Sequence, residues 1–163
     1  MLLRSGQVAK KIHFVCSGAL RAFVADSDGN TYNKNIFLDN DFAGSTVSYL
    51  RGVPSRFAIE SLEETTLISL NYQKYREIID NNTDMKDFYV AYLERNWIIE
   101  KEAREVSIVM ENATDRYLKL LGQHPGIDQR IQKVHLASHI GVTPTQLSRI
   151  RKNLKEKSQN QPM

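Results

Sequence analysis

The chain has 163 residues, of which 41% are hydrophobic and 25% are charged. This length allows one or two small domains and argues against a large multidomain enzyme, and the composition is that of a globular protein. No run of about 18 apolar residues occurs, so we predict no transmembrane span. The net charge of +3 divides unevenly: residues 1–112 carry 13 basic and 16 acidic side chains, and residues 113–163 carry 9 and 3. The basic C-terminal third predicts an anionic partner.

Cysteine usage indicates a reducing compartment. Cys16 is the only cysteine, so the chain has no internal disulfide and no cysteine cluster for zinc or an iron–sulfur centre. Residues 12–25 follow two lysines, but polar residues interrupt this stretch and it alternates as strands do, which disfavours a signal peptide. We therefore predict a cytoplasmic protein.

Residues 1–70 predict short β-strands separated by turns. Residues 26–30 are a turn cluster, because Gly29 and Asn30 tolerate a positive φ. Such spacing favours an antiparallel barrel or sandwich, followed by a short helix over residues 72–79 that Asn71 caps. The candidate strands cover residues 12–16, 19–25, 31–38, 56–62 and 65–70.

Residues 82–111 lack glycine and proline and predict one long helix. Two positions recur every seven residues through four repeats, which is typical of a coiled-coil seam, and Asn96 is its one clearly polar member. Because Phe88, Trp97 and Val109 widen the apolar stripe, packing on the chain's own domain is the alternative. We favour a homodimer through this helix. The predicted seam consists of Met85, Tyr89, Tyr92, Asn96, Ile99, Ala103, Val106 and Met110.

Residues 113–163 predict three helices, over 113–121, over 132–140 and from Pro144 onward, with the polar residues 155–163 frayed. The second and third have the pattern of a helix-turn-helix, with Gly141 at the sharp turn. The apolar residues that should hold this pair together are Leu136, Ala137, Ile140, Val142, Leu147 and Ile150. The alternative is an ordinary helical hairpin with a solvated basic face.

The third helix carries the residue types that read DNA. Arg149 suits bidentate bonding to guanine and Gln146 suits adenine, whereas Thr143 and Lys152 suit phosphates. The predicted DNA contacts are Thr143, Pro144, Thr145, Gln146, Ser148, Arg149 and Lys152.

His135 and His139 lie four residues apart, a spacing that metal-binding helices use. Leu136 stands where the metalloprotease pattern needs Glu, and no third ligand is evident. We therefore expect no metal site, and we expect these histidines on the surface near phosphates.

Residues 41–60 predict a strand, a glycine turn at Gly44, one helical turn, a loop at 52–54 and Arg56 before the next strand. Amides at a helix N-terminus, together with an arginine, suit a phosphate.

At this point the sequence resembles the Crp/Fnr family of bacterial transcription regulators, over nearly the whole chain. Residues 113–121 (ATDRYLKLL) and 147–151 (LSRIR) are similar to members from Bacteroidetes-type bacteria. The resemblance implies an α+β fold: an antiparallel β jelly roll like a cyclic nucleotide-binding domain over residues 1–81, a dimerisation helix over 82–111, and a helix-turn-helix DNA-binding domain over 112–163.

Three features depart from the family pattern. Ser45 replaces the glutamate that follows Gly44 in the family, and Ser55 falls where the phosphate-binding arginine stands; Arg56 is one residue further, on the opposite face of a strand. Gly44, Ser45, Ser55 and Arg56 are thus an altered effector site, and a cyclic nucleotide is disfavoured. The family usually has a helix and a strand before the region resembling residues 3–6, so we expect either a shortened reading frame or a β-roll that is incomplete at its N-terminus. Little chain follows Lys152 to form a β-hairpin wing.

These features predict a homodimeric, sequence-specific DNA-binding regulator that recognises an inverted-repeat operator and acts with RNA polymerase. The alternative is a ligand-sensing module whose output is a protein partner. The sequence has no nucleophile elbow, P-loop or dinucleotide-binding glycine motif, so we do not expect an enzyme.

Overall fold

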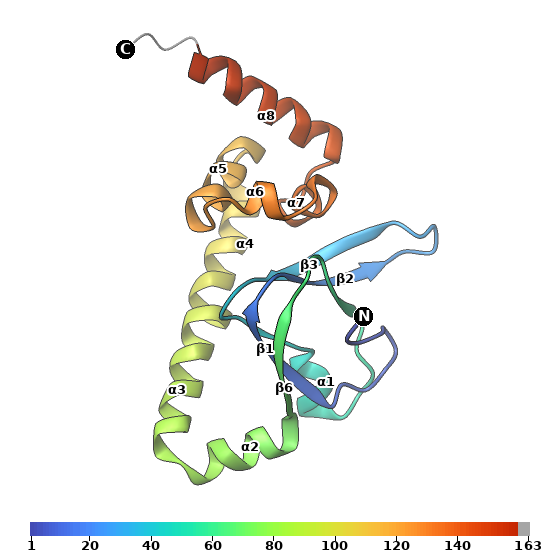
Figure 1. Ribbon diagram of the computed structural model, residues 1–163, viewed down its shortest axis with the longest axis vertical. Helices are drawn as coiled ribbons and strands as arrows, with labels where there is room; N and C mark the ends of the chain where they lie inside the picture. Colours follow the sequence, from blue (N-terminus) through green and yellow to red (C-terminus); the bar gives the residue numbers. More distant parts are fainter. Residues whose placement is uncertain (160–163) are drawn as a thin grey trace. The chain divides into compact units, whose positions relative to one another are not determined.

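The computed structural model describes residues 1–159 (Figure 1). The chain divides into two compact units, Met1–Ala103 and Arg104–Met163. The boundary between them falls inside the last part of the predicted long helix.

The first unit is a β-roll of two antiparallel three-stranded sheets, followed by helices (Figure 1). The strand orders are β4-β1-β6 and β3-β2-β5. The strand-rich N-terminal half predicted from the turn pattern is confirmed. The elements are β1 Lys11–Ser17, β2 Leu20–Ala25, β3 Thr31–Phe37, β4 Phe42–Ala43, α1 Thr46–Arg51, β5 Ala58–Ser61, β6 Thr66–Asn71, α2 Tyr72–Asn81 and α3 Thr83–Leu93.

The core of the first unit joins the two sheets. Leu20 and Ile59 are almost fully enclosed, and burial of each such side chain contributes about 1.5–3 kcal/mol to folding. Alternation along the strands produces this core, because every second side chain points to the same face. The buried cluster comprises Val15, Leu20, Ala22, Phe37, Ala43 and Ile59.

A second cluster lies where α2 and α3 meet the β-roll. Asn71 caps α2 as predicted, because its side chain accepts a hydrogen bond from the Lys74 amide at 3.1 Å. Tyr72, Tyr75 and Ile79 are buried on α2, and Met85 and Tyr89 from α3 pack against them.

The predicted long helix is continuous but not uniform. After α3 it passes through the π-helical segment η1, Glu94–Ile99, and continues as α4, Glu100–Met110. The uniform 3.6-residue period expected over residues 82–111 is therefore wrong at residues 94–99.

The second unit consists mainly of helices: α5 Ala113–Gln123, α6 Ile127–Arg130, α7 Lys133–His139 and α8 Pro144–Gln159. The short helix α6 was not predicted. The expectation of fraying from residue 155 is wrong up to Gln159, because α8 extends that far; residues 160–163 lie outside the described part of the chain. Within residues 1–159, no helix combines the length and apolar character needed to cross a membrane.

Candidate nucleic-acid interface and effector loop

A sharp turn at Gly141 joins helices α7 and α8. Gly141 has φ 72°, which a residue with a side chain rarely adopts, and the Val142 amide donates to the Ala137 carbonyl at 2.9 Å. Leu136 and Ala137 from α7 and Leu147 from α8 have no exposed surface, as the apolar pattern predicted. One side of α8 is thereby fixed against α7, and its other sides carry polar side chains.

The start of α8 has a reciprocal cap. The Gln146 amide donates to Thr143 Oγ1 at 3.1 Å, and the Thr143 amide donates to Gln146 Oε1 at 2.8 Å. Ser148 is also engaged within the unit, since its hydroxyl donates to the Pro144 carbonyl and accepts from Lys133 Nζ. Gln146 and Ser148 therefore have local hydrogen bonds, whereas Thr145, Arg149 and Lys152 are exposed.

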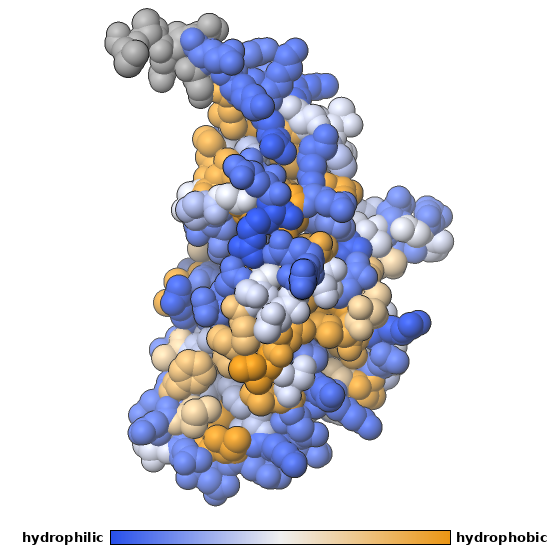
Figure 2. Space-filling model, in the orientation of Figure 1, coloured by the Kyte–Doolittle hydropathy of each residue, from blue (hydrophilic) through white to orange (hydrophobic). Residues whose placement is uncertain are grey.

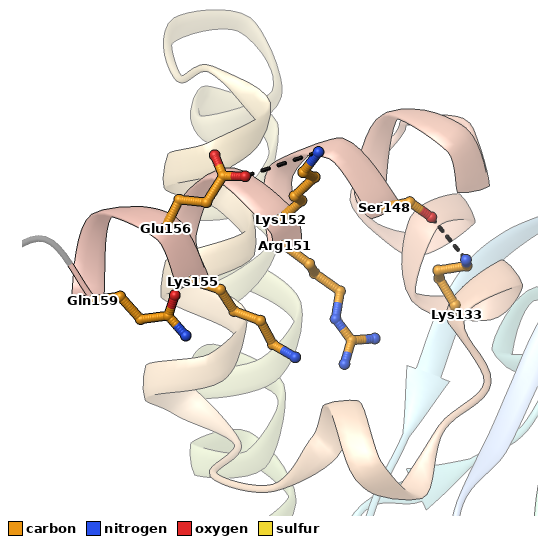
Figure 3. Close-up of a pocket in the computed structure, with 7 residues that line it drawn as sticks. All are labelled: Lys133, Ser148, Arg151, Lys152, Lys155, Glu156 and Gln159. Atoms are coloured by element: carbon orange, nitrogen blue, oxygen red, sulfur yellow. Dashed lines mark hydrogen bonds and ion pairs between the residues drawn. The ribbon is translucent and has the colours of Figure 1, made fainter.

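One side of α8 lines a basic groove (Figure 3). Arg151 and Lys155 project from the same side of α8, and Lys133 of α7 reaches Ser148 (Figure 3). Arg151 also pairs with Asp128 at 3.4 Å, and Lys152 pairs weakly with Glu156 at 3.8 Å. In the view of Figure 2, hydrophilic residues cover much of α8. Lys133 and Lys155 line this groove but were not among the predicted DNA contacts. The sequence feature that could have identified them is the presence of basic residues on the predicted helices.

A second groove lies on another side of α8. The start of α5, where Asn112 caps the helix through the amides of Thr114 and Asp115, faces Arg149 and Lys157 across it. Among the described residues, no hydrogen bond or ion pair engages the guanidinium of Arg149. Its charge is therefore available to an external ligand.

Two arginines hold the carbonyl end of α7. Arg104 Nη2 donates to the His139 carbonyl at 3.4 Å, and Arg116 Nε donates to the Ile140 carbonyl at 3.0 Å. Cations at a helix C-terminus interact favourably with its carbonyls. These contacts fix the end of α7 immediately before the Gly141 turn.

His139 is not the surface residue that we predicted. Its Nδ1 is enclosed and has no hydrogen-bond partner among the described residues. Burial lowers the pKa of His139 to about 3, and the nearby charge of Arg104 contributes to this shift. His135 is half-buried. No group of three candidate metal ligands occurs within residues 1–159.

The predicted effector loop surrounds α1. A Cβ at Gly44 would overlap the hydroxyl and ring of Tyr49, so a larger residue at this position would require the Tyr49 side chain to shift. Tyr49 donates its hydroxyl to the Lys11 carbonyl and stacks on Tyr72 with ring centroids 4.4 Å apart. The start of α1 is thus built into the packing between β1 and α2.

The serines of this loop point inward. Ser55 is 3% exposed, and its hydroxyl donates to the Phe57 carbonyl at 2.8 Å. Ser45 is 2% exposed and provides no side-chain cap to α1, and Arg56 is exposed. Of the predicted effector residues, Ser45 and Ser55 are therefore buried, whereas Arg56 is exposed.

The predicted dimer seam is divided between two environments. Tyr92 accepts a hydrogen bond from the Phe42 amide at 3.1 Å, and Met85 and Tyr89 contact α2, so this half packs against α2 and β4 of its own unit. From the last residue of η1 onward the seam is exposed: Ile99 is 65% exposed, and Ala103, Val106 and Met110 are also exposed.

Comparison with known proteins agrees with this architecture. The family model of the cyclic nucleotide-binding domain matches residues 1–82. The cAMP-activated global transcriptional regulator CRP of Pasteurella multocida (strain Pm70) is 22% identical over 166 residues, which cover 95% of this chain and 78% of that protein.

Solved structures show the same fold. FixK2 from Bradyrhizobium japonicum superposes with a TM-score of 0.78 at 16% identity, covering 96% of this chain and 80% of that one. TTHB099, a CRP-family transcriptional regulator from Thermus thermophilus, has a TM-score of 0.72 at 18% identity, covering 97% and 81%.

A β-roll followed by a long helix and a helical unit is the architecture that this chain shares with these structures. The chain belongs to the cyclic nucleotide-binding domain family, whose model matches residues 1–82. Over nearly its whole length it is similar to regulators of the Crp/Fnr type.

Proposed function

We propose that this protein is a sequence-specific DNA-binding transcription regulator in which α7 and α8 form the helix-turn-helix and α8 is the recognition helix. The observation that carries this proposal is the arrangement of α8: Leu147 is fully buried against α7, while Thr145, Arg149 and Lys152 are exposed. A helix held in this way can enter the major groove without losing its own packing.

The polar residues of α8 and its neighbours have separate roles in this proposal. Arg149 reads a guanine, because its guanidinium has no partner among the described residues and its fork matches two acceptors on that base. Lys152, Lys155 and Lys133 neutralise phosphates, and Thr143 contacts a phosphate beside the cap. Pro144, Gln146 and Ser148 support the start of α8, and Gln146 contacts adenine only if its capping bond opens.

The regulator acts as a homodimer. Ile99, at the end of η1, and Val106 and Met110 of α4 are 65%, 54% and 77% exposed, which leaves a row of apolar side chains largely open to solvent. A second copy of the chain would cover this row and present two recognition helices to an inverted repeat, with half-sites about one turn of DNA apart. In this proposal, residues 1–81 bind the effector, residues 82–111 form the dimer interface and residues 112–163 bind DNA. RNA polymerase is the expected protein partner.

Two kinds of effector are candidates for the β-roll: a cyclic nucleotide and another small ligand. Family membership makes a cyclic nucleotide a candidate, whereas the inward hydrogen bonds of Ser55 and the absence of a carboxylate at Ser45 disfavour it. A ligand sensor with only a protein partner is the second candidate, but no observation favours it over DNA binding.

Selection from a pool of random DNA duplexes tests the proposal. The purified chain should enrich an inverted repeat with half-site centres about 10 base pairs apart or a multiple of that spacing. Recovery of no sequence above the starting pool, from a folded protein, would overturn it. An Ile99→Asp variant provides the dimer test, because it should sediment as a monomer and lose preference for the paired half-sites.

A further inference from the structure

The long helix contains a π-turn at the point where its environment changes. In η1 the Glu100 amide donates to the Arg95 carbonyl, five residues back rather than four. A π-turn holds an extra residue, and short π-turns inside α-helices occur frequently at functional sites. Because each residue of an α-helix advances the face by about 100°, η1 displaces the pattern after it by one residue.

Before η1, the heptad pattern faces the β-roll. Met85 and Tyr89 pack on α2, and Tyr92 meets Phe42 both through its hydroxyl and through ring contact at 5.2 Å. In an uninterrupted α-helix, Ile99 and Ala103 would continue this same face. Instead, Ile99 is 65% exposed.

Asn96 lies inside the π-turn and bonds to its own helix. Its Nδ2 donates to the Tyr92 carbonyl at 3.0 Å, and its side chain is half-buried. A side chain that bonds the carbonyl four residues back competes with the main-chain amide for that oxygen and favours a local departure from α geometry. The one polar member of the predicted seam is thus bound within its own chain.

Loss of the π-turn would change which residues α4 presents. With the same number of residues in a regular helix, the place of each seam residue relative to the β-roll would pass to the preceding residue. Ile99, Ala103, Val106 and Met110 would give way to Ile98, Glu102, Glu105 and Val109. Two carboxylates would then enter a seam that is otherwise apolar, where they would oppose the same carboxylates of a second copy.

We propose that Asn96 is a positioning residue that holds η1 in its π form, so that one helix packs on its own β-roll before η1 and presents an apolar seam to a second copy of this chain after it. This inference rests on the proposed homodimer. It assigns the seam to Ile99, Ala103, Val106 and Met110, and it gives Asn96 an intrachain role.

Cysteine crosslinking tests the inference, in chains that also carry Cys16→Ser. In the parent, oxidation should crosslink Val106→Cys between copies and should leave Glu105→Cys largely uncrosslinked. Asn96→Leu should reverse this preference, and Asn96→Asp, which keeps the size but removes the donor, should act in the same direction. Circular dichroism and sedimentation establish that each variant is folded and report its oligomeric state.

Deletion of Arg95 supplies the matched control, because this side chain is 79% exposed in its pair with Glu100. The π-turn holds one extra residue, so deleting one residue converts it to a regular helix and leaves the direction of the α4 side chains unchanged. Asn96→Leu combined with the deletion should therefore restore crosslinking at Val106→Cys. A folded dimer whose crosslinking is unchanged by Asn96→Leu and Asn96→Asp would overturn this inference and leave the homodimer intact. A parent chain that sediments as a monomer would overturn both.

Discussion

The loop around α1 and the helix α8 use polar side chains in opposite ways. In the loop, Ser48 and Ser55 are almost fully buried and bond to nearby backbone, with Ser48 linking the Ala9 amide to the Val53 carbonyl. On α8, Arg149 and Lys152 project from a helix whose apolar side is already buried. Polar groups that are satisfied internally stabilise a fold, whereas exposed charges on a fixed helix remain available to a ligand.

The second unit therefore carries the clearer candidate binding surface. The loop lies where the family has its ligand site, but the hydroxyls of Ser48 and Ser55 form hydrogen bonds to the backbone of the β-roll. Helix α8 has both the charge and the mechanical support that binding to an extended polyanion requires. Changes in the two regions should therefore have different consequences.

The largest effect is expected from the buried side of α8. Leu147→Ala should lower the free energy of unfolding of the second unit by about 2–5 kcal/mol, because it removes a fully enclosed side chain and leaves a cavity. Urea denaturation followed by circular dichroism measures this loss. The matched change Leu118→Ala, at a position that is 46% exposed on α5, should cost much less; equal losses would contradict the packing described for α8.

Arg149→Ala should weaken binding to the selected operator by about 1–3 kcal/mol and relax the preference at one base pair. The reason is loss of a bidentate base contact while the fold is unchanged, since Arg149 is exposed. Competition binding against operator variants gives the measurement.

Lys152→Ala is the control for that prediction. It should weaken binding to all duplexes alike and reduce the slope of log affinity against log salt by about 1. If Arg149→Ala behaves in this way instead, Arg149 is a phosphate contact.

His139, whose Nδ1 is buried, should make the stability of the second unit depend on pH. Its pKa is about 3 in the folded chain and is ordinarily 6.5, so between these values the unfolded chain binds the proton more readily. Stability should therefore fall as the pH is lowered from 6.5, by up to about 1.4 kcal/mol per pH unit from this group. Urea midpoints at pH 7 and pH 5 should differ less for His139→Gln than for the parent chain; an identical difference would exclude His139 as the source.

The smallest effect is expected in the loop. Ser55→Ala should cost about 1 kcal/mol of folding free energy, because the Phe57 amide loses its partner, while operator affinity stays the same. Thermal unfolding and DNA titration of the same preparation separate the two quantities. A large loss of DNA affinity at unchanged stability would show that the loop controls α8.

The sequence predicted the parts of the structure that depend on periodicity. Alternating strands, the Asn71 cap, the Gly141 turn and the burial of Leu147 follow from local spacing and residue size, and all are present. These features require no knowledge of distant contacts.

The rest depended on contacts that a linear pattern does not contain. The residues of the seven-residue repeat do not share one environment. Those before the π-turn pack within the first unit, as Tyr92 does on Phe42, and those after it are exposed. His139 had the spacing of a surface ligand and was enclosed beside Arg104, which lies 35 residues earlier. Ser55 was identified as a departure from a motif, yet its hydrogen bonds to Phe57 appear only in three dimensions.

Titration of the selected operator and of a scrambled duplex of equal length, each at about 50 and 200 mM salt, tests the central claim most directly. We predict that α8 confers tighter binding to the operator at both salt concentrations, and that affinity for both duplexes falls steeply as salt rises. Equal affinity for the two duplexes, or binding that does not change with salt, would contradict the assignment of α8 as a DNA recognition helix.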